Sequence, residues 1–509
     1  MLRLVFAKKK STQRKVLSMI KSIQHFQTEG VKNLEKVFVS YSADMTKIAE
    51  MVYGVKNEII QLGLDMIVEE LETYDEYLRK HKNIRPEWYI VRKDTTTLLT
   101  SLGSITYKKT LFKNKVTGKS EYLLDRVMGI EKHARMTEDA EAELLKEAVQ
   151  SSYQKGGISA CISDEFVSKE TVKNKIHALE FPENKEVLSE KKVVDYLYID
   201  ADEDHVSLQF HEKKGDLAKL ENNRKDNCAI AKLVYVYEGI EKEEPKSKRH
   251  KLINPYYFCR ACDGDANQLF WDEIFRYIEN HYDLDKVKKI YLNADGGAWI
   301  KAGKNRIAGI TYVLDEFHLE KYLTKLTSHM KDTREDAKKE LVHAIRNEKK
   351  SDFESIVERL KDCLESETGI KRIETSKDYI LSNWMAARLR LNRKEGVVGC
   401  SAEGHVSHVL SSRMSSRPLG WSVVGMGKMA ELRAYQYNNG DMLELVRYQK
   451  TLLPKAAGCE EVVSSCAELL LQESKHRQNL GVYANTKTYS IPYQQIRKIA
   501  NFKGHIYGL

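Results

Sequence analysis

Acidic side chains crowd the stretch LYIDADEDHV, residues 197–206, whose apolar start is typical of a buried strand. Asp200, Asp202, Glu203 and Asp204 all fall within it. Carboxylates this close repel one another and are costly to bury. Divalent cations remove that cost, because they neutralise the repulsion. The stretch is therefore typical of one wall of a metal site.

Two further acids could complete such a site. Asp295 ends the run KIYLNA, at the carboxyl end of a predicted parallel strand, where ligands bind in open α/β sheets. Gly296 and Gly297 follow and allow a tight turn and the close approach of a substrate. Glu403 lies in the first turn of a helix predicted to be capped by Ser401. Carboxylates from two strands and a helix can hold two Mg²⁺ ions about 3.5 to 4 Å apart for chemistry at a phosphodiester.

Each acid also has an ordinary structural interpretation. Asp295 could be a turn aspartate after a strand, and Glu403 could be favoured by the helix dipole alone. Strand alternation puts Asp200, Asp202 and Asp204 on one face, so alternation does not choose among them. The placement of all these acids in one order of elements favours a site.

The elements of residues 193–319 would position the acids. Strands are predicted at 195–210, 228–238, 252–260, 288–294 and 309–315, with a helix at 265–281. Three strands in succession, followed by helix, strand, short helix and strand, predict an antiparallel meander that parallel strands extend. This is the order of the RNase H-like (retroviral integrase-like) fold, a mixed α/β fold. Residues 320–395 have an almost wholly helical pattern and would be inserted before the helix of Glu403.

The N-terminal part contains a long predicted helix and a hairpin. Residues 44–80 carry a heptad stripe, which suits a core helix of a bundle or a dimerisation helix. NKVTGK lies between two strand-like runs and predicts a β-hairpin whose turn contains Gly118. The stripe consists of Met45, Ile48, Val52, Val55, Ile59, Leu62 and Met66.

A later helix predicted to begin after Ser168 could meet DNA. Its apolar positions would face inward and leave Lys169, Lys173 and Asn174 outside. This suits the recognition helix of a helix-turn-helix, although a plain helical hairpin has the same pattern.

Composition narrows the class of partner. The chain has 509 residues, a formal net charge of +9 and a pI near 8.8, which point to polyanions. No apolar run reaches the roughly 18 to 20 residues of a membrane helix, and MLRLVFAKKK is the reverse of a secretory signal. We therefore expect a cytoplasmic protein with no membrane partner.

Cys259 and Cys262 have CxxC spacing but no second ligand pair, so we expect two ordinary thiols.

Four blocks of the sequence resemble the ISLre-type insertion-sequence transposases, relatives of the Mutator-like DDE group. The blocks are YIDADEDHVSLQ (198–209), NADGGAWIKAG (293–303), TYVLDEFHLEKYL (311–323) and CSAEGHVSHVLSSRMSSRPLGWS (400–422). The resemblance implies a DDE transposase with an RNase H-like core and a helical insertion before its glutamate. By position, Asp295 matches the second acid and Glu403 the third. The family pattern after the first acid matches Asp202, with valine at Val206, and not Asp200.

Other polar residues could assist such a site. His318 could orient a phosphate or the third acid, His408 lies nearer the face of Glu403 than His405 does, and Asp200 could assist Asp202. Phosphate contacts are predicted at Arg413, Arg417 and Lys428, since such side chains suit phosphate groups. Each of these could equally be a structural or solvated side chain.

The expected activity is metal-dependent cleavage at element ends, followed by strand transfer of 3′-hydroxyls into target DNA. The expected cofactors are two Mg²⁺ (or Mn²⁺) ions. The expected partners are double-stranded DNA (terminal inverted repeats and target) and further copies of the chain, in a homodimer or larger assembly, in a bacterial cytoplasm at the nucleoid. Alternatives are an RNase H-like nuclease without strand transfer and an inactive DNA-binding relative.

The predicted organisation has six parts. They are an N-terminal helical region (1–95), a β-hairpin and helix-turn-helix-like DNA-binding region (96–190), the first part of the RNase H-like core (191–319), the helical insertion (320–395), the glutamate-bearing and following helices of the core (396–452), and a C-terminal tail (453–509).

Overall fold

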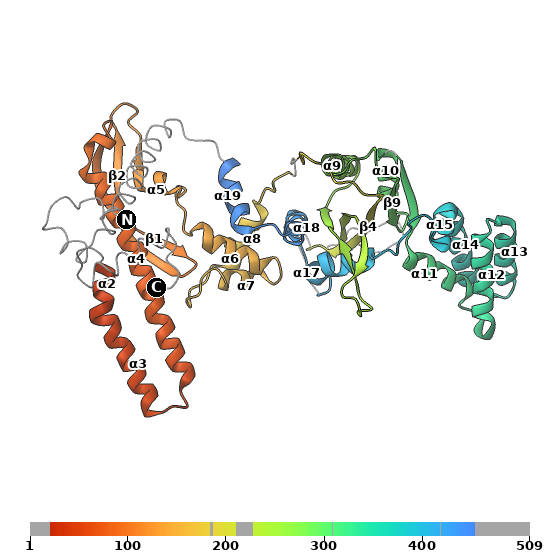
Figure 1. Ribbon diagram of the computed structural model, residues 1–509, viewed down its shortest axis with the longest axis horizontal. Coiled ribbons are helices and arrows are strands. Elements are labelled where there is room, and N and C mark those ends of the chain that lie inside the picture. Colours follow the sequence, from red (N-terminus) through yellow and green to blue (C-terminus); the bar gives the residue numbers. More distant parts are fainter. Residues whose placement is uncertain (1–20, 184–186, 210–227, 308, 418, 453–509) are drawn as a thin grey trace, which may run out of the picture. The chain divides into compact units, whose positions relative to one another are not determined.

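The structure is a computed structural model that describes residues 21–183, 187–209, 228–307, 309–417 and 419–452. The predicted tail, 453–509, lies outside these residues. The chain divides into two compact units (Figure 1). The described part of the first consists of residues 21–145, 154–168 and 449–452, and that of the second of residues 146–153, 169–183, 187–209, 228–307, 309–417 and 419–448.

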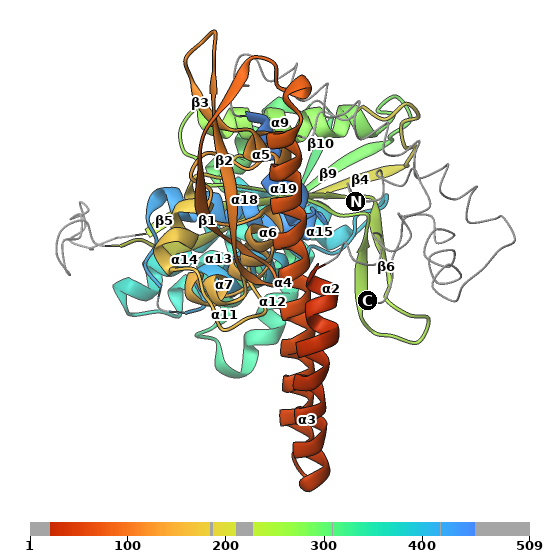
Figure 2. The ribbon, with the colours of Figure 1, turned by 90° about the vertical axis from the view of Figure 1, so that its left-hand side faces the viewer.

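The first unit joins a helical hairpin to a three-stranded sheet. Figure 2 shows its two long helices, α3 and α4, lying side by side. The sheet has the order β1-β2-β3 and is antiparallel. Gly118 has φ +70° in the turn between β2 and β3, so the predicted hairpin is confirmed. The elements are α2 (Lys21–His25), the π-helix η2 (Phe26–Gly30), α3 (Val31–Ala43), α4 (Ile48–Lys80), η3 (Lys82–Ile84), β1 (Trp88–Thr100), β2 (Gly103–Asn114), β3 (Ser120–Tyr122) and α5 (Leu123–Met128).

Only the C-terminal half of α4 belongs to a core. There Tyr74 and Leu78 pack with Trp88, Tyr107 and other residues of the sheet. The N-terminal half keeps most of its heptad stripe exposed. The core-helix interpretation of the whole stripe is therefore wrong for this half.

Three helices follow the sheet: α6 (Glu138–Ala148), α7 (Tyr153–Ile158) and α8 (Lys169–His177). Residues 159–168 separate α7 from α8, whereas a helix-turn-helix joins its helices by a turn of about three or four residues. The described elements therefore do not form the predicted helix-turn-helix. Val172 and Ile176 of α8 are buried, as the helical pattern predicted.

The second unit is built on a five-stranded sheet of order β10-β9-β4-β5-β8. Strand β5 pairs antiparallel with both β4 and β8, and β9 and β10 continue the sheet parallel to β4. This is the predicted meander with two parallel strands. The strands are β4 (Tyr196–Ser207), β5 (Cys228–Tyr237), β8 (Tyr256–Arg260), β9 (Lys289–Ala294) and β10 (Ile310–Leu314), beside a separate ribbon of β6 (Gly239–Lys242) and β7 (His250–Ile253).

The two faces of β4 have different neighbours, because side chains alternate along a strand. Leu197, Ile199 and Ala201 enter a core with α9 (Ala266–His281) and α10 (Ala298–Arg306). On the opposite face, the aspartates lie under the segment that carries Glu403. The predicted helix at 265–281 is confirmed as α9.

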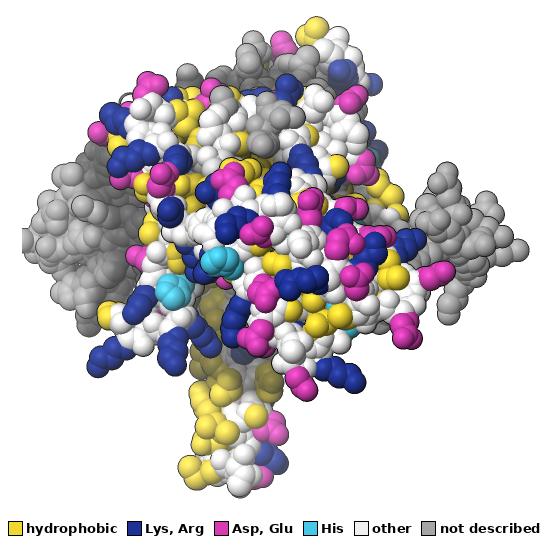
Figure 3. Space-filling model, turned by 90° about the vertical axis from the view of Figure 1, so that its right-hand side faces the viewer, with side chains coloured by type: hydrophobic (Ala, Val, Ile, Leu, Met, Phe, Trp, Pro, Cys, Tyr) yellow, Lys and Arg dark blue, Asp and Glu magenta, His cyan; other side chains and the backbone are white. Residues whose placement is uncertain are grey.

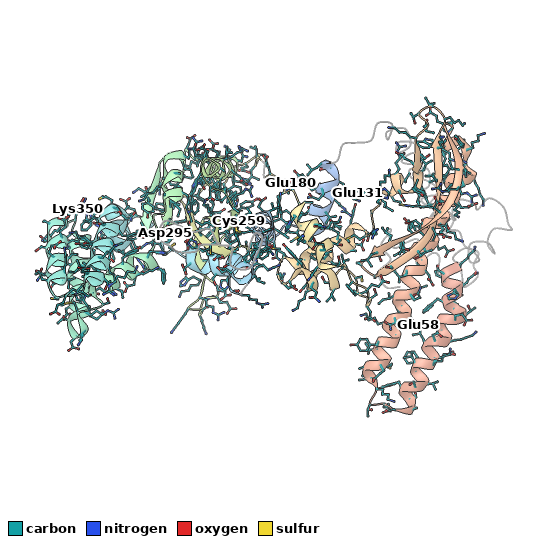
Figure 4. The ribbon with its side chains drawn as sticks, turned by 180° about the vertical axis from the view of Figure 1, so that it is seen from behind. Glu58, Glu131, Glu180, Cys259, Asp295 and Lys350 are labelled. Carbon is teal, nitrogen blue, oxygen red and sulfur yellow. The ribbon has the colours of Figure 1, made fainter. Side chains whose placement is uncertain are left out.

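The predicted helical insertion is also present and has its own core. Leu323, Leu341, Phe353 and Trp384 are among its buried residues. In Figure 4, Asp295 lies where the sheet approaches this insertion. The helices are α11 (Glu316–Thr327), η4 (Lys331–Thr333), α12 (Arg334–Arg346), α13 (Lys350–Asp362), α14 (Glu367–Ser382) and α15 (Trp384–Asn392).

The last described segment is more broken than predicted. The glutamate-bearing helix consists of α16 (Ala402–Val406), the π-helix η5 (Ser407–Ser411) and α17 (Ser412–Met414). The predicted final helix at 428–452 is two helices, α18 (Val423–Tyr437) and α19 (Met442–Leu452), with Asn439 at φ +60° between them. No helix in the described ranges is long and apolar enough to cross a membrane.

Candidate active site

Asp200, the first aspartate of β4, is fully buried and bonded at both carboxylate oxygens. It accepts hydrogen bonds from the hydroxyls of Tyr235 (2.7 Å) and Tyr237 (3.1 Å), from Asn293 Nδ2 (2.7 Å) and from the backbone N–H of Ser401 (3.1 Å). Burial raises the pKa of Asp200, and these bonds oppose the rise. Its oxygens are occupied by neighbours within the chain, which argues for a structural role.

The insertion reaches Asp200 through a buried arginine. Arg390 of α15 is 1% exposed and donates from Nη2 to Asn293 Oδ1 at 2.7 Å, and from Nε to the Leu314 carbonyl at 2.8 Å. Asn293 donates in turn to Asp200. Asn293 thus bridges a buried guanidinium and a buried carboxylate that do not touch, which reduces the cost of burying each charge.

Asp204, the third aspartate, is also held within the chain. The hydroxyl of Ser415 lies 2.9 and 2.8 Å from its two oxygens. Beyond it, Trp421 N–H donates to the Ser207 carbonyl at 3.0 Å, and Gln209 N–H donates to Trp421 at 2.8 Å. The segment that carries Glu403 is therefore tied to β4 near both of its ends, through Asp200 before the glutamate and through Asp204 after it.

Asp202 lies between these two anchors and differs from both. Its recorded hydrogen bond is local, from the Glu203 N–H to Oδ1 at 2.9 Å. The pKa of Asp202 is raised to about 7, first by burial and then by the charges of Asp295 and Glu403, against that local bond and His318. Asp202 is therefore the carboxylate of the stretch that faces the other two predicted acids. Glu203 points to the other face and accepts a bond from Trp299, as strand alternation predicted.

A tight turn fixes Asp295 at the end of β9. Register pairs Ala294 with Ala201, which brings Asp295 level with Asp202 across two parallel strands. Asp295 Oδ1 accepts the Gly297 N–H at 2.9 Å, and its carbonyl accepts the hydroxyl of Tyr379 from the insertion. Gly296 has φ +91°, a conformation that glycine adopts without strain.

Glu403 lies in the first turn of α16 and is exposed. The predicted Ser401 side-chain cap is absent. The Ser401 hydroxyl instead lies 2.8 Å from that of Tyr235, beside the bond of its N–H to Asp200. Helix α16 passes into the π-helical turn η5 at Ser407, and such turns are frequent at functional sites.

His318 lies at the start of α11, beside the acids. Its Nδ1 is 3.0 Å from Asp315 Oδ2, and because a carboxylate accepts, Nδ1 carries the proton. This bond raises the pKa of His318, and the charges of Asp295 and Asp202 raise it further, against burial. Burial alone would raise the pKa of Asp315. Its hydrogen bonds, of which the bond from His318 has the largest effect, instead hold this pKa below its ordinary value. The sequence analysis predicted a role for His318 but not for Asp315. Asp315 could have been found from its position three residues before His318, where an aspartate can cap the helix that follows.

The two histidines of the glutamate helix have different surroundings. His405 is packed against Tyr235 and Tyr257, and its Nδ1 lies 3.1 Å from the Tyr257 hydroxyl. Burial lowers the pKa of His405 to about 4, so this ring is neutral near pH 7. His408 is exposed like Glu403, which agrees with the prediction that it lies nearer the face of Glu403 than His405 does.

The donor set suits a hard divalent cation. Asp202, Asp295 and Glu403 supply carboxylate oxygens from three elements, and Mg²⁺ prefers such ligands. The raised pKa of Asp202 marks a charge that burial and its acidic neighbours leave poorly compensated. In the described part of the chain, no three His, Cys, Asp or Glu side chains already stand close enough to share an ion. Side-chain movement would therefore accompany binding.

The residues predicted to contact DNA differ in how far they are exposed. Arg413 is 7% exposed, donates to the Ala148 carbonyl at 3.2 Å and lies over the rings of Tyr153 and Trp421. It is therefore part of the interior, and its prediction as a phosphate contact is not supported. Lys428 is half-buried and pairs with Glu180 at 3.1 Å. Arg417, Lys169 and Asn174 are exposed, and Lys173 is half-buried beside Glu170.

Cys259 and Cys262 are both free thiols. Burial raises the pKa of each, most strongly at Cys259, so neither is activated as a thiolate. They lie in and after β8, outside the acidic cluster.

The chain belongs to the family described as "Uncharacterised protein family (UPF0236)", whose model matches residues 42–451. A UPF0236 protein of Caldanaerobacter subterraneus subsp. tengcongensis is 36% identical over 398 residues, 78% of this chain and 79% of its own length. Another from the same organism, whose name combines eleven loci, is 35% identical over 414 residues, 81% of this chain and 83% of its own length. The "UPF0236 protein in vanSb 3'region" of Streptococcus gallolyticus is 24% identical and covers 85% of this chain and 91% of its own.

Among solved structures, the "Drosophila P element transposase strand transfer complex" matches with 10% sequence identity and a TM-score of 0.19. The match covers 73% of this chain and 92% of that chain. At that score the similarity carries no weight for fold or chemistry.

Proposed function

We propose that this chain is a DDE-type DNA transposase of the ISLre type, with an RNase H-like catalytic core. The observation that carries the proposal is that Asp295 and Glu403 lie near enough to Asp202 for their charges to raise its pKa, beside a sheet of order β10-β9-β4-β5-β8. These three side chains are the catalytic acids of the proposal. Asp200 and Asp204 are structural in it, because both are bonded within the chain.

The family gives independent support of another kind. One relative carries a single name for eleven loci of one genome. Many copies of one protein in a genome are expected of a mobile element, because each transposition event can add a copy. An ordinary housekeeping enzyme gives no reason for such multiplicity.

The residues would act as follows. Asp202, Asp295 and Glu403 would hold two Mg²⁺ (or Mn²⁺) ions, which supply activation of a water or 3′-hydroxyl and stabilise the leaving oxygen at a phosphodiester. Asp315 orients the His318 ring by accepting the proton of Nδ1, and the raised pKa of His318 favours the imidazolium, whose Nε2 proton could be donated to a phosphate oxygen. Asp200 and Asp204 hold the Glu403 segment against β4.

Double-stranded DNA is the proposed substrate, both at the element ends and at the target. Arg417, Lys169 and Asn174 are exposed and can meet it, and the net charge of +9 favours a polyanion. Joining two ends requires at least two copies of the chain. The proposal places the protein in the bacterial cytoplasm, with the DNA.

The test uses the purified full chain and a supercoiled plasmid that carries the gene with its flanking DNA. We expect nicking at the ends of the element in Mg²⁺ or Mn²⁺, and none in EDTA. Asp295→Asn and Glu403→Gln should each reduce the rate at least about 100-fold, since even outer partners of metal ligands cost 10- to 100-fold. Asp352→Asn and Glu354→Gln, two exposed acids of α13, are the matched controls.

Strand transfer is tested separately with labelled duplexes that already end in the 3′-hydroxyl. Joining to a target plasmid supports a transposase. Nicking without joining would leave an RNase H-like nuclease. Equal nicking by the wild type and both acid variants would remove the catalytic proposal and leave a DNA-binding protein.

A further inference from the structure

An unusual number of large apolar side chains are exposed on the hairpin of α3 and α4. On α4 the heptad stripe from Ile48 to Met66 is uncharged, and the two helices meet beside it, where Val37 packs on Gly54. Soluble monomers rarely expose a continuous apolar patch of this kind. The exposed fractions are Val31 39%, Phe38 47%, Met45 72%, Ile48 58%, Val52 55%, Ile59 46% and Met66 38%.

These side chains lie on one face of the hairpin. Successive residues of an α-helix are about 100° apart, so the stripe on α4 spans roughly 100° and lies about a quarter turn from the side that contacts α3. Val31 and Phe38 lie one heptad apart on α3. They are displaced by a similar angle from the side of α3 that contacts α4. Because the helices are antiparallel, the two displacements point to the same side. Figure 3 shows apolar side chains along one edge of this hairpin and charged ones along the other.

The size of this face suits a partner helix pair. From Ile48 to Met66 the helix rises about 27 Å, and two helices side by side are about 20 Å wide. One copy would therefore bury about 550 Å², and a pair about 1,100 Å², just above the roughly 1,000 Å² that a specific interface should exceed. The stripe is uncharged and matches itself, so a two-fold axis can bring two copies together face to face.

We infer that the apolar face of the α3–α4 hairpin is a dimer interface, on which the same face of a second copy packs to complete a four-helix bundle. The interface follows from the hairpin alone. Its use, to hold two copies while each engages one DNA end, rests on the proposed function. The heptad spacing fits this arrangement, because helices of a bundle meet through such stripes.

The experiment measures the mass of the full chain in solution, without DNA, by light scattering after gel filtration over a range of concentrations. We expect the wild type to approach twice 58.7 kDa at micromolar concentrations. The double variant Val52→Glu with Ile59→Glu should elute as a monomer, with an unchanged circular dichroism spectrum. Val116→Glu, a similar change at a residue 77% exposed in the β2–β3 turn, should remain a dimer.

A second pair of variants guards against simple misfolding. Val52→Lys with Ile59→Lys should also be monomeric, and an equimolar mixture with the glutamate variant should recover the dimer mass, because opposite charges then face each other. A monomeric wild type, or a glutamate variant that stays dimeric, would overturn the inference. Neither result depends on DNA cleavage, so the inference and the proposed function can fail separately.

Discussion

Replacing Asp202 by asparagine should stabilise the metal-free protein. The pKa of Asp202 is raised to about 7 from its ordinary value of 3.8, because the side chain is largely buried beside two other carboxylates. A carboxyl with a raised folded pKa favours the folded state when it is protonated. That contribution is complete below about pH 4 and is lost as the pH rises through 7. Asparagine stays neutral throughout and can keep the local bond of Oδ1 to the Glu203 N–H.

The size of the effect follows from the same values. Each pH unit between the two pKa values corresponds to about 1.4 kcal/mol, so the ionised carboxylate costs the folded state up to about 4 kcal/mol above pH 7. At pH 5 the cost is below about 2 kcal/mol. The Asp202→Asn variant should therefore exceed the wild type in free energy of unfolding, and by about 2 kcal/mol more at pH 8 than at pH 5.

Urea unfolding in EDTA at the two pH values measures this difference, with tryptophan fluorescence as the signal. Asp200→Asn is the matched control: it sets an amide against the donors of Tyr235 and Asn293 and should destabilise the protein at both pH values. Addition of Mg²⁺ should raise the stability of the wild type and leave Asp202→Asn unchanged. A pH-independent effect of Asp202→Asn, or a loss of stability at pH 8, would refute the assigned surroundings of Asp202.

Three further predictions concern neighbouring residues. Gly296→Ala should cost about 1 to 3 kcal/mol in urea unfolding, because its φ is +91° and a Cβ would lie 2.8 Å from Asn383 Oδ1; no loss would place the turn differently. Ser415→Ala leaves Asp204 buried with fewer hydrogen-bond donors. It should lower the unfolding free energy by about 1 to 3 kcal/mol and also lower the rate of DNA nicking. Ser416→Ala, a change at an exposed neighbour, should alter neither quantity. Arg417→Ala should reduce the slope of log K against log salt concentration for DNA binding by about 1. Equal slopes for this variant and the wild type would exclude a phosphate contact at Arg417. Arg413→Ala should instead destabilise the fold.

Local pattern was sufficient for the sheet and for the elements that carry the three acids. Alternating and continuous apolar runs predicted the strands of the second unit, because each is buried by its immediate neighbours. They also predicted α9 and the turn at Asp295. The same pattern misjudged Arg413, because arginine at a helix end has the same local sequence whether it faces solvent or a ring such as Trp421. It could not foresee the break between α18 and α19 either.

The roles of the three aspartates could not be read from their own stretch. Asp200 and Asp204 are distinguished from Asp202 by partners elsewhere in the chain, among them Ser401 and Ser415, each more than 200 residues away. Strand alternation gives all three the same face, so only these distant partners separate them. The family resemblance selects Asp202, and the bonds of Asp200 and Asp204 within the chain support that choice, while a catalytic role for Asp202 stays a prediction.

These bonds also account for three acids on one strand. A helix that carries a catalytic glutamate must be held at a fixed height above the strand, and hydrogen bonds to carboxylates are stronger than those to neutral groups. Asp200 accepts the Ser401 N–H before the glutamate, and Asp204 accepts the Ser415 hydroxyl after it. With both outer carboxylates bonded, the uncompensated charge falls on Asp202, opposite Asp295 and Glu403. In the proposed function the crowding serves two purposes, because the outer aspartates fix the helix and the middle one would bind a cation.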